Sequence, residues 1–278
     1  MAAAAKYVVV GASGEGLGAE KHVAVGRWRD GGEPADAGRL AGEAVRRAVG
    51  MVLAGDADAL VTAPADKAAL QAGGYDFPGH TEMLRQFTGA PAVAMLMAAE
   101  RTRLVGPLRV VLATRHIALS DVPSRLSAEL IVEQARMAAR GLRSGWGIAA
   151  PRLALCAINP HGGDGGLFGD EEAKVLVPAR VRLAEAGISV CGPIPADTVF
   201  VRALRGEFDA VIAPYHDVGM AAFKTASFGS GVNVTLGLPF PRTSPDHGTA
   251  QDIAGRGVAD PGSMIEAMLL AARLCASL

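Results

Sequence analysis

The chain has 278 residues, of which 50% are hydrophobic and 20% charged, and its formal net charge is -1. This near-neutral balance, with Lys and Arg scattered along the chain, argues against a nucleic-acid partner or a membrane surface. No apolar run approaches the roughly 18 residues of a membrane span, and residues 1–16 lack the charged start and long apolar core of a signal peptide. We therefore expect a cytoplasmic protein with one large or two medium domains.

Short apolar runs alternate with amphipathic runs of helical spacing, which is the pattern of parallel βαβ units in an α/β protein. In chain order, the expected strands cover residues 7–13, 58–64, 91–99, 109–116, 152–158, 188–198 (running into a loop), 209–216 and 231–239. The expected helices cover residues 36–54 (with Gly55 as a stop), a short helix beginning within 82–88, and then 124–144, 170–186 and 262–277. No internal repeat and no linker marks a domain boundary.

The cysteines and glycines give further constraints. Cys156, Cys191 and Cys275 form no Cys-x-x-Cys pair, and the first two lie in apolar runs. We expect buried thiols in a reducing compartment rather than disulfides. Glycine is abundant, 35 of 278 residues, and clusters around the histidines and in the C-terminal tail. Such clusters suggest backbone loops that wrap a ligand.

Three of the six histidines follow strand-like runs: RVVLATRH reaches His116, RLALCAINPH reaches His161, and DAVIAPYH reaches His216. Ligands of α/β proteins sit beyond the carboxyl ends of strands, so these imidazoles can converge although they lie 45 and 55 residues apart. Three protein ligands with an open position form the pattern of a catalytic metal site. The alternative for each histidine is a strand cap bonded to a backbone carbonyl. Asp217 is placed to orient His216 or to move a proton, and Asp197 is a weaker candidate of the same kind.

A second candidate site is GHTE, Gly79 to Glu82, at the start of the short helix. His80 and Thr81 offer hydrogen-bond donors at a helix N-terminus, which suits an anion or a hydroxyl group. The alternative is a plain N-cap by Thr81.

A third set of residues is cationic and polar. Lys224, Asn233 and Arg242 follow one another at intervals of nine residues around the Gly-rich strand FGSGVNVTLGLPFPR. An ammonium, an amide and a guanidinium suit a phosphate or a carboxylate, with Arg supplying a bidentate fork. The alternative is a solvated Lys and a solvated Arg. Lys67, in TAPADK just past an expected strand, is a further candidate.

Residues 246–264, DHGTAQDIAGRGVADPGSM, form a Gly-rich segment before the last expected helix. It is not a G-x-G-x-x-G run after a strand, so it is not the Rossmann fingerprint. Its residues alone do not identify a nucleotide loop.

From about residue 58 to the end, the chain resembles the 4-hydroxythreonine-4-phosphate dehydrogenase family of pyridoxal phosphate biosynthesis. The segments that carry the resemblance are TAPADK, FPGHTE, ATRHIAL, NPHGGDGGLFGDEE, PADTVF, YHDVGM and GVNVTLGLPFPRTSPDHGTAQDIAGRGVADPGSM. The tail is also similar to the HGSAPDIAGKG loop with which isopropylmalate dehydrogenases cradle NAD.

The resemblance implies an α/β fold like that of isocitrate and isopropylmalate dehydrogenases, with two α/β subdomains flanking a central cleft. Within a single family domain, 1–278, the approximate subdomains would be 1–76 plus 254–278, and 77–253. It also implies a homodimer in which residues of both chains complete each active site.

Site roles carry over residue by residue as implications of the resemblance. It implies one divalent ion (zinc, magnesium, cobalt or manganese) on His116, His161 and His216, one of them lent by the partner subunit. The substrate would contact His80 and Thr81, and its phosphate or carboxylate would contact Lys224, Asn233 and Arg242. NAD or NADP would be bound by His247, Gly248, Thr249, Ala250 and Asp252. The catalytic candidates, with the proton acceptor left open, are Asp217, Asp246 with His247, and Lys67.

The implied reaction is metal-assisted oxidation of a secondary hydroxyl by NAD(P). The product is a β-keto acid, which loses CO2 easily. For the family's usual substrate, 4-phosphohydroxy-L-threonine, this yields 3-amino-2-oxopropyl phosphate.

The start of the chain departs from the family pattern. Only 61 residues precede TAPADK, and GEGLGAE (14–20) is a partial echo of the family's GDPAGIGPE-type loop.

One alternative to this function is the same chemistry on 4-phospho-D-threonate, 4-phosphoerythronate or a dihydrodiol carboxylate. Another is a degenerate homologue that binds metal and anion without catalysis.

Overall fold

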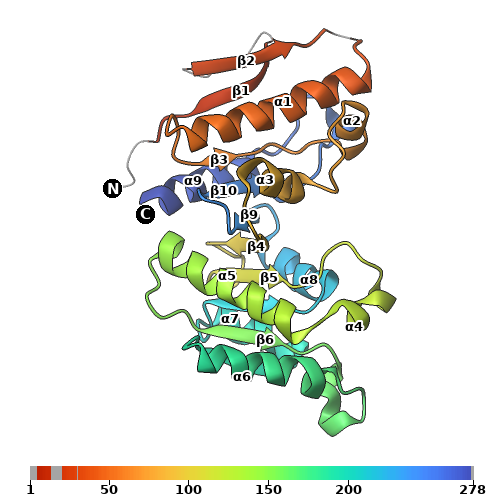
Figure 1. Ribbon diagram of the computed structural model, residues 1–278, viewed down its shortest axis with the longest axis vertical. Helices are drawn as coiled ribbons and strands as arrows, with labels where there is room; N and C mark the ends of the chain where they lie inside the picture. The colour runs from red at the N-terminus through yellow and green to blue at the C-terminus, as the bar shows by residue number, and fades with distance from the viewer. Residues whose placement is uncertain (1–4, 14–20, 30, 277–278) are drawn as a thin grey trace. The chain divides into compact units, whose positions relative to one another are not determined.

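The computed structural model describes residues 5–13, 21–29 and 31–276 (Figure 1). The echo segment 14–20 therefore lies outside the described residues. The chain divides into two compact units, here called unit 1 and unit 2. Unit 1 comprises the described residues of Met1–Val93 and Leu238–Ala276, and unit 2 comprises Ala94–Gly237. The sequence places the corresponding boundaries at 76/77 and 253/254.

Unit 2 contains six strands in the order β9-β4-β5-β8-β6-β7. They are β4 (Ala94–Ala99), β5 (Leu108–Leu112), β6 (Leu153–Cys156), β7 (Val190–Ile194), β8 (Ala210–Ala213) and β9 (Val232–Leu236). β5, β8, β6 and β7 pair in parallel, whereas β4 runs antiparallel to both β5 and β9. The α/β class predicted from the sequence is confirmed, but the expectation of purely parallel units is wrong at β4. A short reversing connection replaces a helical crossover between β4 and β5.

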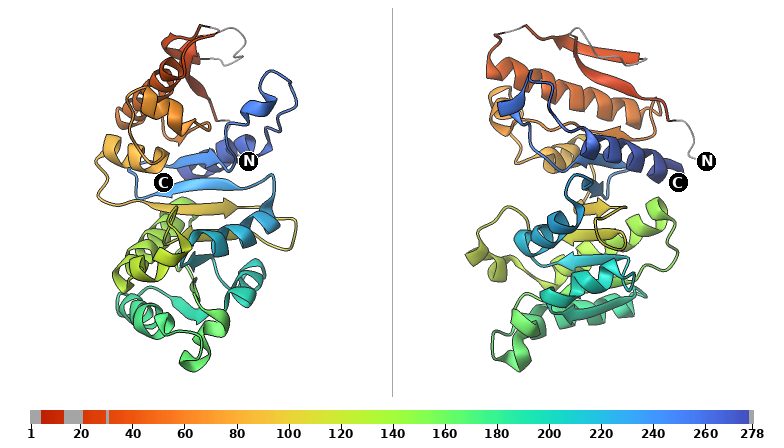
Figure 2. Two further views of the ribbon diagram at one scale, coloured as in Figure 1. Left: turned by 90° about the vertical axis from the view of Figure 1, so that its right-hand side faces the viewer. Right: turned by 180° about the vertical axis from the view of Figure 1, so that it is seen from behind.

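Helices cover both faces of this sheet. α5 (Ala128–Trp146) and α6 (Val177–Glu185) lie on one face, and α7 (Ala196–Leu204) and α8 (His216–Ser227) lie on the other (Figure 2). The Ser127 hydroxyl caps α5 by accepting a 3.1 Å bond from the Leu130 N–H, and Gly147 ends the helix in the left-handed conformation. A short α4 (Val122–Arg125) precedes it. The sequence does not predict α7 or α8.

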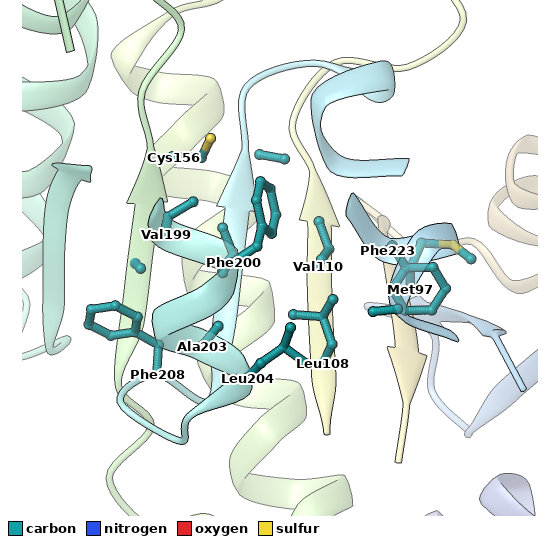
Figure 3. Close-up of a cluster of buried hydrophobic side chains, with 14 of the residues drawn as sticks. Met97, Leu108, Val110, Cys156, Val199, Phe200, Ala203, Leu204, Phe208 and Phe223 are labelled. Carbon is teal, nitrogen blue, oxygen red and sulfur yellow. The ribbon is translucent and has the colours of Figure 1, made fainter. Parts of the chain in front are cut away.

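A large apolar core packs between the sheet and α7 and α8 (Figure 3). Leu108 and Val110 of β5 meet Phe200 of α7 and Phe223 of α8 there, and all four are buried. Burying each such side chain contributes about 1.5–3 kcal/mol. α8 lies very close to the sheet at Gly219, where an added Cβ would be 2.6 Å from a methyl carbon of Leu112. This close packing fixes the position of α8 beside β5.

Unit 1 is built from two separate segments of the chain, one N-terminal and one C-terminal to unit 2. Its elements are β1 (Val8–Ser13), β2 (Lys21–Arg27), α1 (Pro34–Leu53), β3 (Leu60–Val61), α2 (Lys67–Ala72), α3 (His80–Thr88), β10 (Arg242–Pro245) and α9 (Gly262–Ala276). β1 pairs with β2, and β3 pairs with β10, both in parallel. A smaller core of Val49, Leu60, Leu84 and Phe240 links α1, β3, α3 and the segment before β10.

Helices α1 and α2 touch through their backbones. A Cβ added at Gly38 of α1 would lie 1.6 Å from the Ala69 carbonyl oxygen of α2, and one at Gly73 would lie 2.2 Å from the Arg39 nitrogen. Only glycine at these positions permits such a close approach. The contact fixes how α2, which begins at Lys67, packs against α1.

The three cysteines are free. Cys156 is buried as expected, and burial raises its thiol pKa to about 12. Cys191 is exposed, contrary to the expectation, because it lies on the edge strand β7. Across the described residues, the helices are too short or too polar to cross a membrane.

Candidate functional site

Hydrogen bonds join the ends of β5 and β8 just before two of the predicted metal ligands, His116 and His216. The Pro214 carbonyl oxygen accepts hydrogen bonds from both the Thr114 hydroxyl, 2.8 Å, and the Thr114 N–H, 3.2 Å. The Ala113 N–H donates to the Ala213 carbonyl, 2.9 Å. These bonds continue the parallel pairing past the strand ends, so the two chain segments leave the sheet side by side.

His116 and His216 meet where these segments leave the sheet. Their ring centroids lie 5.6 Å apart, with the planes tilted by 45°. His116 has a left-handed backbone, φ 43°, which turns the chain sharply after β5, whereas His216 begins α8. A cavity of about 190 Å³ opens beside the two imidazoles. It is lined by Thr114, Arg115, His116, Ile117, Leu119, Val122, Tyr215, His216 and Asp217.

Asp217 orients the His216 ring. Its Oδ1 lies 2.7 Å from Nδ1 of His216, and its side chain is otherwise 89% exposed. A carboxylate bonded to one ring nitrogen holds the imidazole in place and leaves the opposite nitrogen for another partner. The pair therefore has the arrangement of a metal-ligating histidine with its supporting carboxylate.

Tyr215 also lines the cavity. Burial, with smaller effects of Cys156 and Asp217, raises the pKa of its phenol. It therefore remains a hydrogen-bond donor at neutral pH.

The donor set fits a divalent ion in part. His116 and His216 are neighbours at one rim of the cavity, which suits two imidazole ligands. His161 is not among the residues that line this cavity. Among the described residues of a single chain, no three His, Cys, Asp or Glu side chains gather as a metal site. Two imidazoles of one chain thus have the donor atoms that such an ion prefers.

His161 lies in an unusual loop. After β6, residues His161 to Gly165 all have left-handed backbone angles, with φ of 53° at His161 and 45° at Asp164. His161 is exposed to solvent. Non-glycine residues in this region cost on the order of 1–2 kcal/mol each, so the loop needs support from its surroundings.

In unit 1, two predicted substrate residues influence each other. The Arg242 side chain is 1% exposed and donates a 2.5 Å hydrogen bond to the Thr62 hydroxyl at the end of β3. Burial lowers the Arg242 pKa to about 10, which still leaves a cation at neutral pH. Burial first, and then the Arg242 charge, lowers the His80 pKa to about 4. His80 is thus a neutral imidazole beside a buried guanidinium. Thr81 is also buried.

Asn233 and Lys224 belong to unit 2. Asn233 on β9 pairs with Met97 on β4, and Met97 pairs in turn with Val110 on β5. Paired residues share a face, so Asn233 lies on the face that α8 covers. Its Oδ1 is buried and has no hydrogen-bond partner among the described residues, which is uncommon for a buried amide oxygen. Lys224 is exposed near the end of α8.

The Gly-rich segment of unit 1 is joined to the start of α2. Gln251 donates a 3.2 Å bond to Asp66 Oδ2, and the other oxygen of Asp66 caps α2 by accepting from the Ala69 N–H. Lys67, next in sequence, is the exposed first residue of that helix. The structure therefore connects the predicted cofactor segment with the catalytic candidate Lys67.

Of the remaining predicted residues of this segment, Asp246 is half-buried and the others are exposed to solvent. His247 Nδ1 lies 2.9 Å from the Gly248 carbonyl oxygen, and the Asp246 N–H donates to the Ser263 hydroxyl. Ala250 has a left-handed backbone, φ 49°. Gly248, Thr249, Ala250 and Asp252 are exposed. Asp197, the weaker candidate, is exposed in the first turn of α7.

Sequence reasoning missed three residues of these sites. Tyr215 lines the cavity and Thr62 binds Arg242. Each stands at a strand end, which is the signal that could have found them. The third, Glu172, binds the backbone before His161, and no local pattern marks it.

Comparison with known proteins gives consistent similarities. The family model of the pyridoxal phosphate biosynthetic protein PdxA matches residues 13–271. The 4-hydroxythreonine-4-phosphate dehydrogenase of Caulobacter vibrioides is 45% identical over 232 residues, which cover 84% of this chain and 70% of that protein. The D-threonate 4-phosphate dehydrogenase of Cupriavidus necator is 46% identical over 239 residues, covering 86% and 70%. A crystal structure of the 4-hydroxythreonine-4-phosphate dehydrogenase of Klebsiella pneumoniae superimposes with a TM-score of 0.81 at 37% identity, covering 94% of this chain and 79% of that one.

Proposed function

This chain belongs to the family of the pyridoxal phosphate biosynthetic protein PdxA, and on that premise we propose that it is a divalent-metal-dependent NAD(P) dehydrogenase. Its substrate is 4-phosphohydroxy-L-threonine, which it oxidises and decarboxylates to 3-amino-2-oxopropyl phosphate. The observation that carries the proposal is the His116–His216 pair at the ends of β5 and β8, beside a cavity.

His116 and His216 would hold the metal ion, with His161 as the third ligand. When bound, the ion would supply Lewis-acid polarisation of the substrate oxygens, and NAD(P) would supply the hydride acceptor. Asp217 fixes the His216 ring through Nδ1 and so directs Nε2 to the site. We also propose a homodimer in which the partner subunit lends one of these histidines, as the family resemblance implies.

Arg242, Lys224 and Asn233 would bind the substrate's phosphate or carboxylate. Arg242 is a buried cation, so its attraction for an anion is weakly screened. The side-chain NH2 of Asn233 would donate to the anion, and its unpartnered Oδ1 would accept a hydrogen bond from a substrate hydroxyl or amine. His80 remains neutral beside Arg242 and can donate to a substrate oxygen without adding charge. Thr81 adds a hydroxyl at the same helix start.

The proton of the oxidised hydroxyl goes to a basic side chain of the site. The candidates are Asp217, Asp246 with His247, and Lys67. Asp217 is supported best, since it lines the same cavity as the two histidines. The segment His247 to Asp252 would bind NAD or NADP.

A second candidate substrate is 4-phospho-D-threonate. It is favoured by a relative named D-threonate 4-phosphate dehydrogenase that is as similar to this chain as the 4-hydroxythreonine-4-phosphate dehydrogenases are. The same anion-binding residues would serve both substrates.

The test is NAD(P)H formation by the purified protein with divalent metal, using 4-phosphohydroxy-L-threonine and 4-phospho-D-threonate in parallel. Turnover of the first supports the proposal, and turnover of only the second moves the protein to the alternative substrate. His161→Ala should abolish turnover while the circular dichroism spectrum stays unchanged. If the protein turns over neither substrate and fluorescence shows no saturable NAD(P)H binding, it is a homologue that binds metal and anion without catalysis.

A further inference from the structure

A buried carboxylate lies beneath the loop that carries His161. Glu172 is 5% exposed and stands at the start of a π-helical turn, Glu172–Leu176, that leads into α6. Its side chain points back to the end of β6 rather than to solvent. Nothing in the proposed reaction uses it.

Glu172 is bonded to three N–H donors of the segment before His161. Its Oε1 accepts from the Ile158 N–H, 2.9 Å, and from the Asn159 N–H, 2.7 Å. Its Oε2 accepts from the Asn159 side-chain amide, 2.9 Å. Hydrogen bonds to an ionised acceptor are about twice as strong as neutral ones, so the carboxylate fixes the backbone two residues before His161.

The loop is wrapped around this carboxylate. A Cβ added at Gly163 would lie 3.1 Å from Glu172 Oε2, and one at Gly169 would lie 2.7 Å from the Asn159 amide nitrogen. Glu171 accepts a 2.6 Å hydrogen bond from the same Asn159 side-chain amide, which is a contact with a side chain and not with the loop backbone. Glu172 thus holds the backbone, whereas Glu171 holds only the Asn159 side chain.

The loop needs such an anchor, because His161 and Asp164 are both held in the left-handed region. For a residue with a Cβ this conformation is strained, and it persists only where neighbouring contacts hold it in place. The hydrogen bonds that Glu172 accepts from Ile158 and Asn159 hold the backbone directly before the left-handed residues begin.

We propose that Glu172 is a positioning residue, which clamps Ile158 and Asn159 and thereby sets the direction in which His161 is presented to the metal ion. The inference rests on the proposed function, since it takes His161 to be a ligand. Glu172 acts only through the loop and touches neither substrate nor metal.

The test uses metal-free, full-length protein and two measurements. Hydrogen–deuterium exchange of peptides covering 157–169 reports the clamp itself, and titration with Co2+, followed by its visible absorption, reports the metal site. Glu172→Ala should speed exchange at residues 158 and 159 and weaken Co2+ binding by roughly 10- to 100-fold, the usual effect of removing an outer support. Glu172→Gln, which keeps an acceptor oxygen, should give a smaller change in both.

Two control variants separate positioning from general destabilisation. Glu171→Ala removes the neighbouring carboxylate, and Glu100→Ala removes a half-buried carboxylate of unit 2, which binds Arg109 and Trp146. Both should leave Co2+ affinity and the Co2+ spectrum much less affected than Glu172→Ala does.

Three results would overturn the inference. Unchanged exchange in both Glu172 variants would show that no clamp exists. Faster exchange with unchanged Co2+ affinity would show a clamp that does not position His161. If the wild-type protein bound no Co2+ at all, the metal site of the proposed function would fail, and the role given to Glu172 would fail with it, whatever the exchange data show.

Discussion

The Thr114 hydroxyl donates a 2.8 Å hydrogen bond to the Pro214 carbonyl oxygen, and each of these residues stands two positions before a histidine of the proposed metal site. The bond is buried and joins segments that are 100 residues apart in sequence. It therefore links the stability of the sheet end to the spacing of His116 and His216.

Thr114→Val should lower the free energy of unfolding by about 1 kcal/mol, because the hydroxyl bond is lost while the shape is kept. It should also weaken Co2+ binding, because the two histidine segments are less firmly joined. Urea titration and Co2+ titration measure the two effects. Thr243→Val, which removes an equivalent buried hydroxyl–carbonyl bond to Ala267 in unit 1, should cost similar stability and leave Co2+ affinity unchanged. An equal loss of Co2+ affinity in both variants would contradict a link between the Thr114–Pro214 hydrogen bond and the metal site.

The lowered pKa of His80 predicts a pH-dependent stability. The imidazole has a pKa of about 4 in the folded protein and 6.5 as its ordinary value, so between these values the unfolded chain binds a proton that the folded one does not. The free energy of unfolding should therefore fall as the pH drops from about 6.5 toward 4. Urea titrations across this range should show a smaller fall for His80→Gln. An NMR titration of the His80 ring that gave a pKa near 6.5 would refute the prediction.

Arg242→Lys should impair recognition of the phosphorylated substrate. Lysine keeps the positive charge but lacks the planar fork and the reach to Thr62, and a lost charged hydrogen bond costs about 1.5–3 kcal/mol. We expect KM to rise roughly 10- to 100-fold, with a smaller change in kcat. Thr62→Val, which removes only the partner of Arg242, should raise KM less. A change confined to kcat would place Arg242 in a different role.

The backbone contact between α1 and α2 predicts opposite effects for two glycines of one helix. Gly38→Ala forces the helices apart, since its Cβ would meet the Ala69 carbonyl oxygen, and should cost about 1–3 kcal/mol of stability. Gly50→Ala has no neighbour within 4 Å and should stabilise α1 by about 0.5–1 kcal/mol. Urea denaturation of both variants measures the difference. A stabilising Gly38→Ala would show that the helices do not pack in this way.

The residue pattern predicts most of the elements because their periodicity is strong. The helix expected at 36–54 is α1, and Gly55 follows it with φ 81°. The pattern at 188–198 predicts a strand running into a loop and so misses α7, although Pro195 and Asp197 are helix-start signals, because its nine residues follow directly on a strand. The pattern also misses α8, because it predicts His216 at a strand end and because small residues such as Gly219 and Ala226 face the sheet. The direction of β4 has no sequence signal, since side-chain alternation is the same in either direction.

The candidate site also contains residues that the sequence predicts and one that it does not. The nearness of His116 and His216 follows from their common place after apolar strands, and the structure confirms that these two meet. The joint role of all three histidines stays a prediction. Glu172 could not be found from the pattern, because its partners are backbone N–H groups 13 and 14 residues away. Such an acceptor is recognised only once the chain is folded.

Unit 1 is built from both ends of the chain, and this has a consequence for the order of events on the ribosome. Thr62 and β3 leave the ribosome about 180 residues before Arg242 and β10. At about 5–20 residues per second, that interval is on the order of ten seconds or more. Unit 2 lies between them as one uninterrupted stretch and can bury its core during the wait. His116 and His216 therefore both leave the ribosome before Arg242, a proposed anion-binding residue, does.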